Sequence, residues 1–145
     1  MPEDRFQKLP GIIETVVGYT GGTTEDPTYE RIGDHTEAIR VTFNPRVLPL
    51  DELYRFFWRE HQPSPSYFGA QYRSAVFCHG QSQRHVAAAV RSSLIGDSPF
   101  ASSLGETAIE DAGPFYRAEE YHREHKPSLS HLLPSVVTTG LSAVL

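Results

Sequence analysis

The pattern of apolar and polar residues predicts two strands near the start of the chain. Residues 12–20 (IIETVVGYT) are rich in β-branched side chains, and residues 33–43 (GDHTEAIRVTF) end in an alternation of apolar and polar positions. Successive side chains of a strand point to opposite faces, so Ile39 and Val41 share one face with Glu37. Both segments are predicted to be strands. In the second, a carboxylate heads an apolar face, which places it either in solvent at a frayed strand end or in a pocket.

The remaining apolar positions predict helices, further strands and a long loop. Leu53, Phe56 and Phe57 recur at helical spacing. Residues 21–35 are rich in Gly, Pro, Asp and Thr and are predicted to be a loop. We predict helices at 3–11, 51–60, 81–94 and 116–125, strands at 70–79 and 105–111, and a loosely held tail at 127–145, where no period is visible.

This order of elements predicts the fold class. Helix, strand, strand, helix, strand, helix and strand follow one another without an internal repeat or a linker. Such an order is typical of an α+β domain, in which helices pack on a face of one sheet. We therefore expect a single α+β domain over residues 1–126, followed by the tail.

Composition narrows the classes of protein further. The 145 residues carry 13 Lys and Arg against 18 Asp and Glu, for a net charge of -5, so neither nucleic acid nor an anionic membrane is an expected partner. No apolar run approaches the roughly 18 residues of a membrane helix, and the start does not resemble a signal peptide. The lone cysteine, Cys78, excludes an internal disulfide and fits a reducing compartment. We expect a cytoplasmic monomer.

Two motifs have ordinary explanations. VGYTGG, at 17–22, lacks the lysine and the following helix of a phosphate loop, and a tight turn with Tyr19 packed beneath it explains the glycines. His122 and His125 lie on adjacent helical turns, but their spacing is poorer than the i, i+4 pair of a zinc helix. Solvated surface histidines are the simpler interpretation, and no metal is expected.

A third candidate combines Glu37 with two tyrosines. Tyr29 lies eight residues before Glu37, and Tyr72 lies in the segment QYRS. A single glutamate at a strand start is more often at the surface, and tyrosines are usually core or rim residues. The residues alone predict an α+β domain with one candidate buried acid, and no more.

Taken together, five stretches resemble the A-type peptide methionine sulfoxide reductases. They follow one another over roughly residues 3–125 and read LPGIIETVVGYTGG, DPTYERIGDHTEAIRVTFNP, LYRFFWREHQPS, GAQYRSAVF and FYRAEEYHREH. VGYTGG followed by PTY, GDHTEAI and QYRS is far more specific than any one of these motifs. The resemblance implies an α+β fold with a mixed sheet and flanking helices, which we expect to be ferredoxin-like, of the split β-α-β type.

The resemblance also implies a reaction. The family reduces the S epimer of methionine sulfoxide, free or in proteins, when a cysteine thiolate attacks the sulfur while the oxygen is protonated. Burial raises the pKa of a carboxyl, so Glu37 on its apolar face matches the general acid. Tyr29 and Tyr72 match the tyrosines that hold the oxygen. Reducing equivalents are expected from thioredoxin or another thiol, without a cofactor.

The nucleophile is where this sequence departs from the family. In the family it lies in a Gly-Cys-Phe-Trp motif, and Glu3 and Phe6 match residues that follow this motif. The resemblance therefore places the cysteine three residues before Met1 and describes an N-terminally truncated domain. Cys78 is a poor replacement, because six strand residues, roughly 20 Å, separate it from Tyr72. It is expected to be a small apolar strand residue.

Three hypotheses follow from this comparison. The first is a methionine-S-sulfoxide reductase whose nucleophile lies upstream of Met1, so that the chain as it stands is inactive. The second is a catalytically inactive relative that binds oxidised methionine. The third and most remote is a histidine-based metal-binding protein.

Overall fold

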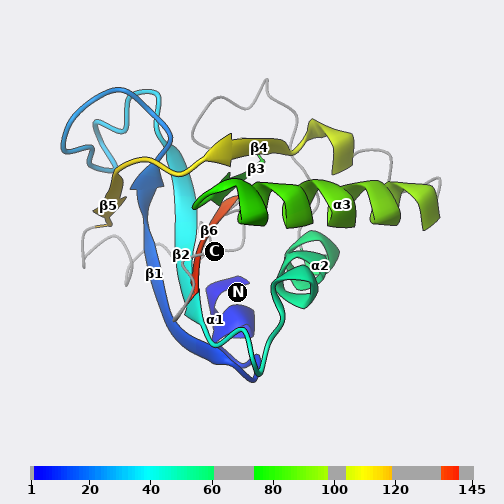
Figure 1. The fold of residues 1–145 in the computed structure, drawn as a ribbon. Coiled ribbons are helices and arrows are strands. Elements are labelled where there is room, and N and C mark those ends of the chain that lie inside the picture. Colours follow the sequence, from blue (N-terminus) through cyan, green and yellow to red (C-terminus); the bar gives the residue numbers. More distant parts are fainter. Residues whose placement is uncertain (1, 61–73, 98–103, 119–134, 141–145) are drawn as a thin grey trace.

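The computed structural model describes residues 2–60, 74–97, 104–118 and 135–140 (Figure 1). Its elements, in chain order, are α1 (Pro2–Gln7), β1 (Ile12–Thr20), β2 (Thr36–Phe43), α2 (Leu50–Glu60), β3 (Ala75–Cys78), α3 (Gln81–Asp97), β4 (Ala108–Asp111), β5 (Phe115–Arg117) and β6 (Ser135–Gly140). The strands form one sheet in the order β4-β3-β6-β2-β1-β5. No helix of the described residues is long and apolar enough to cross a bilayer.

The sheet is mixed, as expected. β1 pairs antiparallel with both β2 and β5, whereas β2, β6, β3 and β4 run parallel to one another. Helix α2 links β2 to β3, and β6 lies between these two parallel strands. One strand therefore splits the β-α-β unit, and the expected class, a single mixed domain of sheet and helices, is confirmed.

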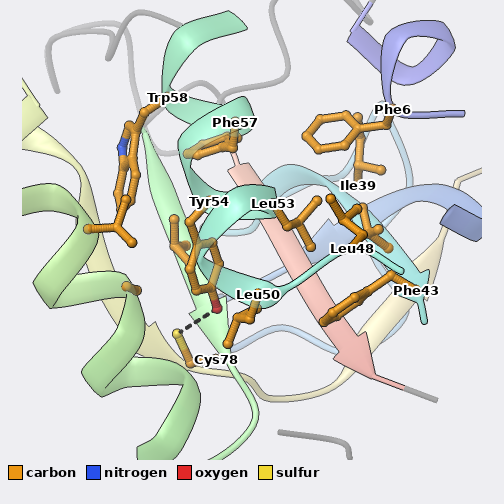
Figure 2. Close-up of a cluster of buried hydrophobic side chains, with 14 of the residues drawn as sticks. Phe6, Ile39, Phe43, Leu48, Leu50, Leu53, Tyr54, Phe57, Trp58 and Cys78 are labelled. Atoms are coloured by element: carbon orange, nitrogen blue, oxygen red, sulfur yellow. Dashed lines mark hydrogen bonds between the residues drawn. The ribbon is translucent and has the colours of Figure 1, made fainter. Parts of the chain in front are cut away.

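One face of the sheet carries the main core, and all three helices contribute to it (Figure 1). Helix α2 presents Leu53 and Phe57 to this face, because apolar residues three and four apart lie on one side of a helix (Figure 2). The strands contribute alternate residues, such as Ile39 and Val41 of β2. The other buried members are Phe6, Val17, Tyr19, Phe43, Leu48, Leu50, Tyr54, Trp58, Val76, Cys78, Ala87, Val90, Leu104 and Ala118.

The opposite face of the sheet carries a smaller cluster of buried side chains. Ala38, Ala75 and Phe77 are fully buried there, and Phe115 packs against them. A Cβ at Gly18 would lie 2.4 Å from the Tyr116 carbonyl oxygen and 2.5 Å from the Phe115 ring, so the close approach of β5 to β1 requires glycine at this position.

Two segments differ from the sequence predictions. The helix predicted at 116–125 is wrong at its start, where Phe115–Arg117 is strand β5. Its backbone pairs with β1 in the register Tyr19 to Tyr116, and the Ala118 N–H donates to the Val17 carbonyl at 2.9 Å. The unpaired edge of β1 supplies hydrogen bonds that override the helical preference of this short segment. Residues 119–125 lie outside the described part.

The tail predicted beyond Pro127 contains the second difference. Ser135–Gly140 is strand β6, with Ile39 of β2 and Val76 of β3 on either side of Val136. The expectation of no regular structure is therefore wrong for these six residues. A short parallel strand gains its hydrogen bonds from distant strands, so its own sequence carries little signal. The domain boundary at residue 126 stays a prediction.

Candidate active site

Glu37 lies inside the protein, on the face of β2 that carries the main core. Its side chain is 1% exposed, and Ile39 follows it on the same face at 1%. Across the sheet, Glu37 pairs with Tyr19 of β1, whose side chain is fully buried. Tyr19 pairs in turn with Tyr116 of β5. The carboxyl group thus lies in a row of side chains that crosses three strands, and the frayed-end alternative is excluded.

The loop at 21–35 is closed at its base, where residues 22–24 meet residues 33–35. Asp34 accepts hydrogen bonds from the Thr23 backbone N–H and hydroxyl, both at 2.8 Å. The first of these bonds is the main reason that the pKa of Asp34 lies below its ordinary value. A Cβ at Gly22 would meet the Asp34 carboxylate at 2.5 Å. We call these two short segments the neck of the loop.

His35 forms the buried part of the neck. Its side chain is 2% exposed. The Gly22 N–H donates to Nδ1 at 3.1 Å, and Nε2 lies 2.7 Å from the Thr24 carbonyl oxygen. Because Nδ1 accepts and a carbonyl cannot donate, these two contacts assign the neutral ring with its proton on Nε2. The ring also packs edge-on against Tyr116, with centroids 5.5 Å apart.

The middle of the loop turns back onto the protein. Pro27 is buried, while Tyr29 and Ile32 are half-buried and pack against the main core. Thr28 and Glu30 between them are exposed. Tyr29 is therefore held on a loop that has one side in solvent and the other against the core.

Cys78 lies on the same face of the sheet as Glu37, at the other end. It is fully buried beneath α2, with its sulfur 3.7 Å from the Tyr54 hydroxyl oxygen (Figure 2). Burial raises the pKa of its thiol above the ordinary value. The strand register places its Cα roughly 16 Å from that of Glu37. The interpretation of Cys78 as a small strand residue in an apolar setting is confirmed.

The structure describes part of the region in which the predicted site residues lie. It places Glu37 inward and Tyr29 on the adjoining loop, whereas Tyr72, His122 and His125 lie outside the described residues. Within the part of the chain that is described, no group of three His, Cys, Asp or Glu side chains could hold a metal ion.

Sequence reasoning missed three residues around Glu37. Tyr116 was assigned to a helix, and Tyr19 was interpreted only as a packed residue beneath a turn. His35 carried a usable signal, because it precedes Glu37 by two residues and continues the alternation that marks the buried face.

Comparison with known proteins identifies the family of the chain. The model of the family "Peptide methionine sulfoxide reductase" matches residues 2–134. The chain is 39% identical over 128 residues to peptide methionine sulfoxide reductase MsrA of Ligilactobacillus salivarius, covering 82% of this chain and 74% of that protein. It is 41% identical over 133 residues to the MsrA of Methanothermobacter thermautotrophicus, covering 85% and 78%.

Solved structures give the same result. Methionine sulfoxide reductase A of Corynebacterium diphtheriae superposes with a TM-score of 0.70 at 30% identity, over 88% of this chain and 68% of that one. The reduced form of Mxr1 from Saccharomyces cerevisiae gives 0.65 at 31% identity, over 77% and 68%. The chain belongs to the MsrA family of peptide methionine sulfoxide reductases.

Proposed function

We propose that this chain provides the acid and the oxygen-binding groups for reduction of methionine-S-sulfoxide, free or in proteins, to methionine. The observation that carries the proposal is Glu37, a carboxyl 1% exposed on an apolar sheet face. Removal from water favours the neutral form of a carboxyl, and only that form can donate a proton. Tyr29 on the adjoining loop and Tyr72 are proposed to donate hydrogen bonds to the sulfoxide oxygen.

The proposed step is balanced as follows. A cysteine thiolate attacks the sulfoxide sulfur, and Glu37 donates its proton to the sulfoxide oxygen. The sulfur–oxygen bond breaks, the sulfoxide sulfur gains two electrons to become a thioether, and the oxygen ends on the cysteine as a sulfenic acid. Two equivalents of an external thiol, with thioredoxin the proposed donor, then release water and return the cysteine to its thiol while they form a disulfide.

The nucleophile is proposed to precede Met1. Family resemblance supports a position three residues upstream. Cys78 is not proposed for this role, because it is fully buried beneath α2 and far along the sheet from Glu37. Its raised pKa also leaves less thiolate than an exposed cysteine would have at neutral pH.

Two forms of the protein test the proposal. One is the chain as it stands, and the other carries Gly-Cys-Phe-Trp directly before Met1. Each is incubated with dithiothreitol and a peptide containing either epimer of methionine sulfoxide, and the loss of one oxygen is followed by mass spectrometry. We expect turnover of the S epimer by the extended form and none by the shorter form.

The outcomes separate the hypotheses. Turnover by the shorter form that is lost in Cys78→Ala would overturn the assignment of the nucleophile. An extended form that binds the S epimer but does not reduce it would support the inactive relative that binds oxidised methionine.

A further inference from the structure

We propose that His35 is a positioning residue that holds the loop carrying Tyr29 at the end of β2 where Glu37 lies. The role in substrate binding rests on the function proposed above, whereas the effect on the loop does not. Three observations support it: the two hydrogen bonds of the ring, its burial, and its place in the chain.

The first observation is that His35 bridges both sides of the loop base. Its Nδ1 accepts from the Gly22 N–H at 3.1 Å, and its Nε2–H donates to the Thr24 carbonyl at 2.7 Å. Both partners are backbone groups just after β1, and His35 itself directly precedes β2. One ring therefore fixes the two ends of a 15-residue loop, a length that needs such anchors to stay ordered.

The second observation is that the other hydrogen bonds of the neck are more exposed to water. Asp34 accepts hydrogen bonds from Thr23, but its carboxylate is exposed, so water competes for the same groups. His35 is 2% exposed, so water has little access to its ring. Loss of the ring would remove the partners of the Gly22 N–H and the Thr24 carbonyl together, which is the more damaging change.

The third observation is the position of His35 between the loop and the strand. His35 precedes Glu37 by two residues, and its ring packs against Tyr116 of β5. The loop that His35 closes carries Tyr29, which packs against the main core. A shift of this ring would move the loop relative to the strand that carries Glu37.

Amide exchange in the chain as it stands tests the effect on the loop. His35→Phe keeps a flat ring against Tyr116 and removes both hydrogen bonds, so the Gly22 amide is expected to exchange at least about tenfold faster. His35→Asn places its side-chain oxygen where Nδ1 was and is expected to restore protection of Gly22. His35→Gln places its amide nitrogen near Nε2 instead and is expected to leave Gly22 unprotected. Far-UV circular dichroism confirms that each variant folds.

Two further measurements complete this test. In the unmodified chain, nitrogen-15 spectra of His35 are expected to show a proton on Nε2 and none on Nδ1. His85 is an exposed histidine of α3, and His85→Phe is the matched control. It is expected to leave the protection of the Gly22 amide unchanged. Wild-type exchange of Gly22 in folded His35→Phe, or a proton on Nδ1, would overturn the proposal.

Binding of N-acetyl-methionine-S-sulfoxide, followed by NMR titration with the R epimer as control, tests the link to Tyr29. If His35 acts through Tyr29, His35→Phe and Tyr29→Phe each weaken binding, and the double variant is no weaker than the worse single one. Fully additive losses would overturn the link. Failure of the unmodified chain to bind either epimer would count against the proposed function, while the Gly22 exchange would still decide the role of His35 in the loop.

Discussion

Glu37 and Cys78 are two buried ionisable groups on the same face of one sheet, and their surroundings differ in kind. Glu37 lies beside Tyr19 and at the foot of a loop whose outer residues are in solvent. Cys78 lies beneath α2, among apolar side chains and next to the Tyr54 hydroxyl (Figure 2). One group is close to a partly exposed loop, and the other is covered by a helix.

The difference shows that burial alone does not identify a reactive group. Burial favours the neutral form of both side chains. A neutral carboxylic acid is useful to a reaction that needs a proton, whereas a neutral thiol has lost the form that attacks. The same physical effect therefore favours Glu37 as an acid and disfavours Cys78 as a nucleophile. Four predictions examine this comparison.

The largest effect is expected on catalysis. In the form that carries Gly-Cys-Phe-Trp before Met1, Glu37→Gln is expected to lower the rate of S-epimer reduction by roughly 10²- to 10⁴-fold, the usual contribution of a general acid. Cys78→Ala, which removes the other buried group, is expected to change the rate by less than about twofold. Steady-state rates with a sulfoxide peptide measure both, and a reversed order of the two effects would break the comparison.

The second effect is on stability. Leu53→Ala opens a cavity under α2 in the main core and is expected to lower the free energy of unfolding by about 2–5 kcal/mol. Tyr29→Phe, on the half-buried loop, is expected to lower it by less than about 1 kcal/mol. Urea unfolding followed through Trp58, the one tryptophan of the chain, gives both values. Equal losses would show that the loop is as much a part of the core as α2.

The third effect is on the Cys78 thiol. Burial raises its pKa, and access is blocked, so its reaction with a disulfide reagent is expected to be at least about a hundredfold slower in the folded protein than in urea. The unfolded thiol ionises at a lower pH than the folded one. The contribution of the neutral Cys78 thiol to the free energy of unfolding is therefore fully present below the ordinary cysteine pKa of 9.0. It is lost as the pH rises from there through the pKa of the folded protein.

Cys78→Ala provides the control, because it lacks this alkaline component. Unfolding curves at several pH values above neutrality compare it with the unmodified chain. Parallel losses of stability in both proteins would assign the alkaline component to another group.

The smallest effect is expected at the neck of the loop. The Thr23 backbone N–H lowers the pKa of Asp34, so the bond between them is present above the ordinary aspartate value of 3.8 and is lost as the pH falls through the lower, folded value. Thr23→Ala removes the hydroxyl bond alone and is expected to move the pKa of Asp34 part of the way back up. NMR titration of the carboxyl carbon measures both proteins, and an unchanged pKa would show that the hydroxyl contributes nothing.

The sequence predicted what depends on local periodicity. The alternation in β2 assigned Glu37 to the same face as Ile39 and Val41, and these side chains are buried together. The loop at 21–35 was visible in its glycines and its proline. Such features depend only on neighbouring residues in the sequence, so the sequence alone is sufficient to predict them.

What depends on distant partners was missed. β5 is a three-residue strand because β1 offers it an open edge, and nothing within FYR requires this. The bonds of His35 form only when Gly22 and Thr24 come back to meet it. β6 was missed for the same reason, since its partners precede it by more than fifty residues.

The position of β6 has a consequence for synthesis on the ribosome. This strand separates β4 and β3 from β2, β1 and β5, so the two parts of the sheet share no paired strand until it is inserted (Figure 1). During translation, β2 and β3 emerge long before residues 135–140, and until then each has an open edge of backbone hydrogen-bonding groups. Nascent chains that stop before Ser135 therefore have two open strand edges, at which such chains can pair with one another.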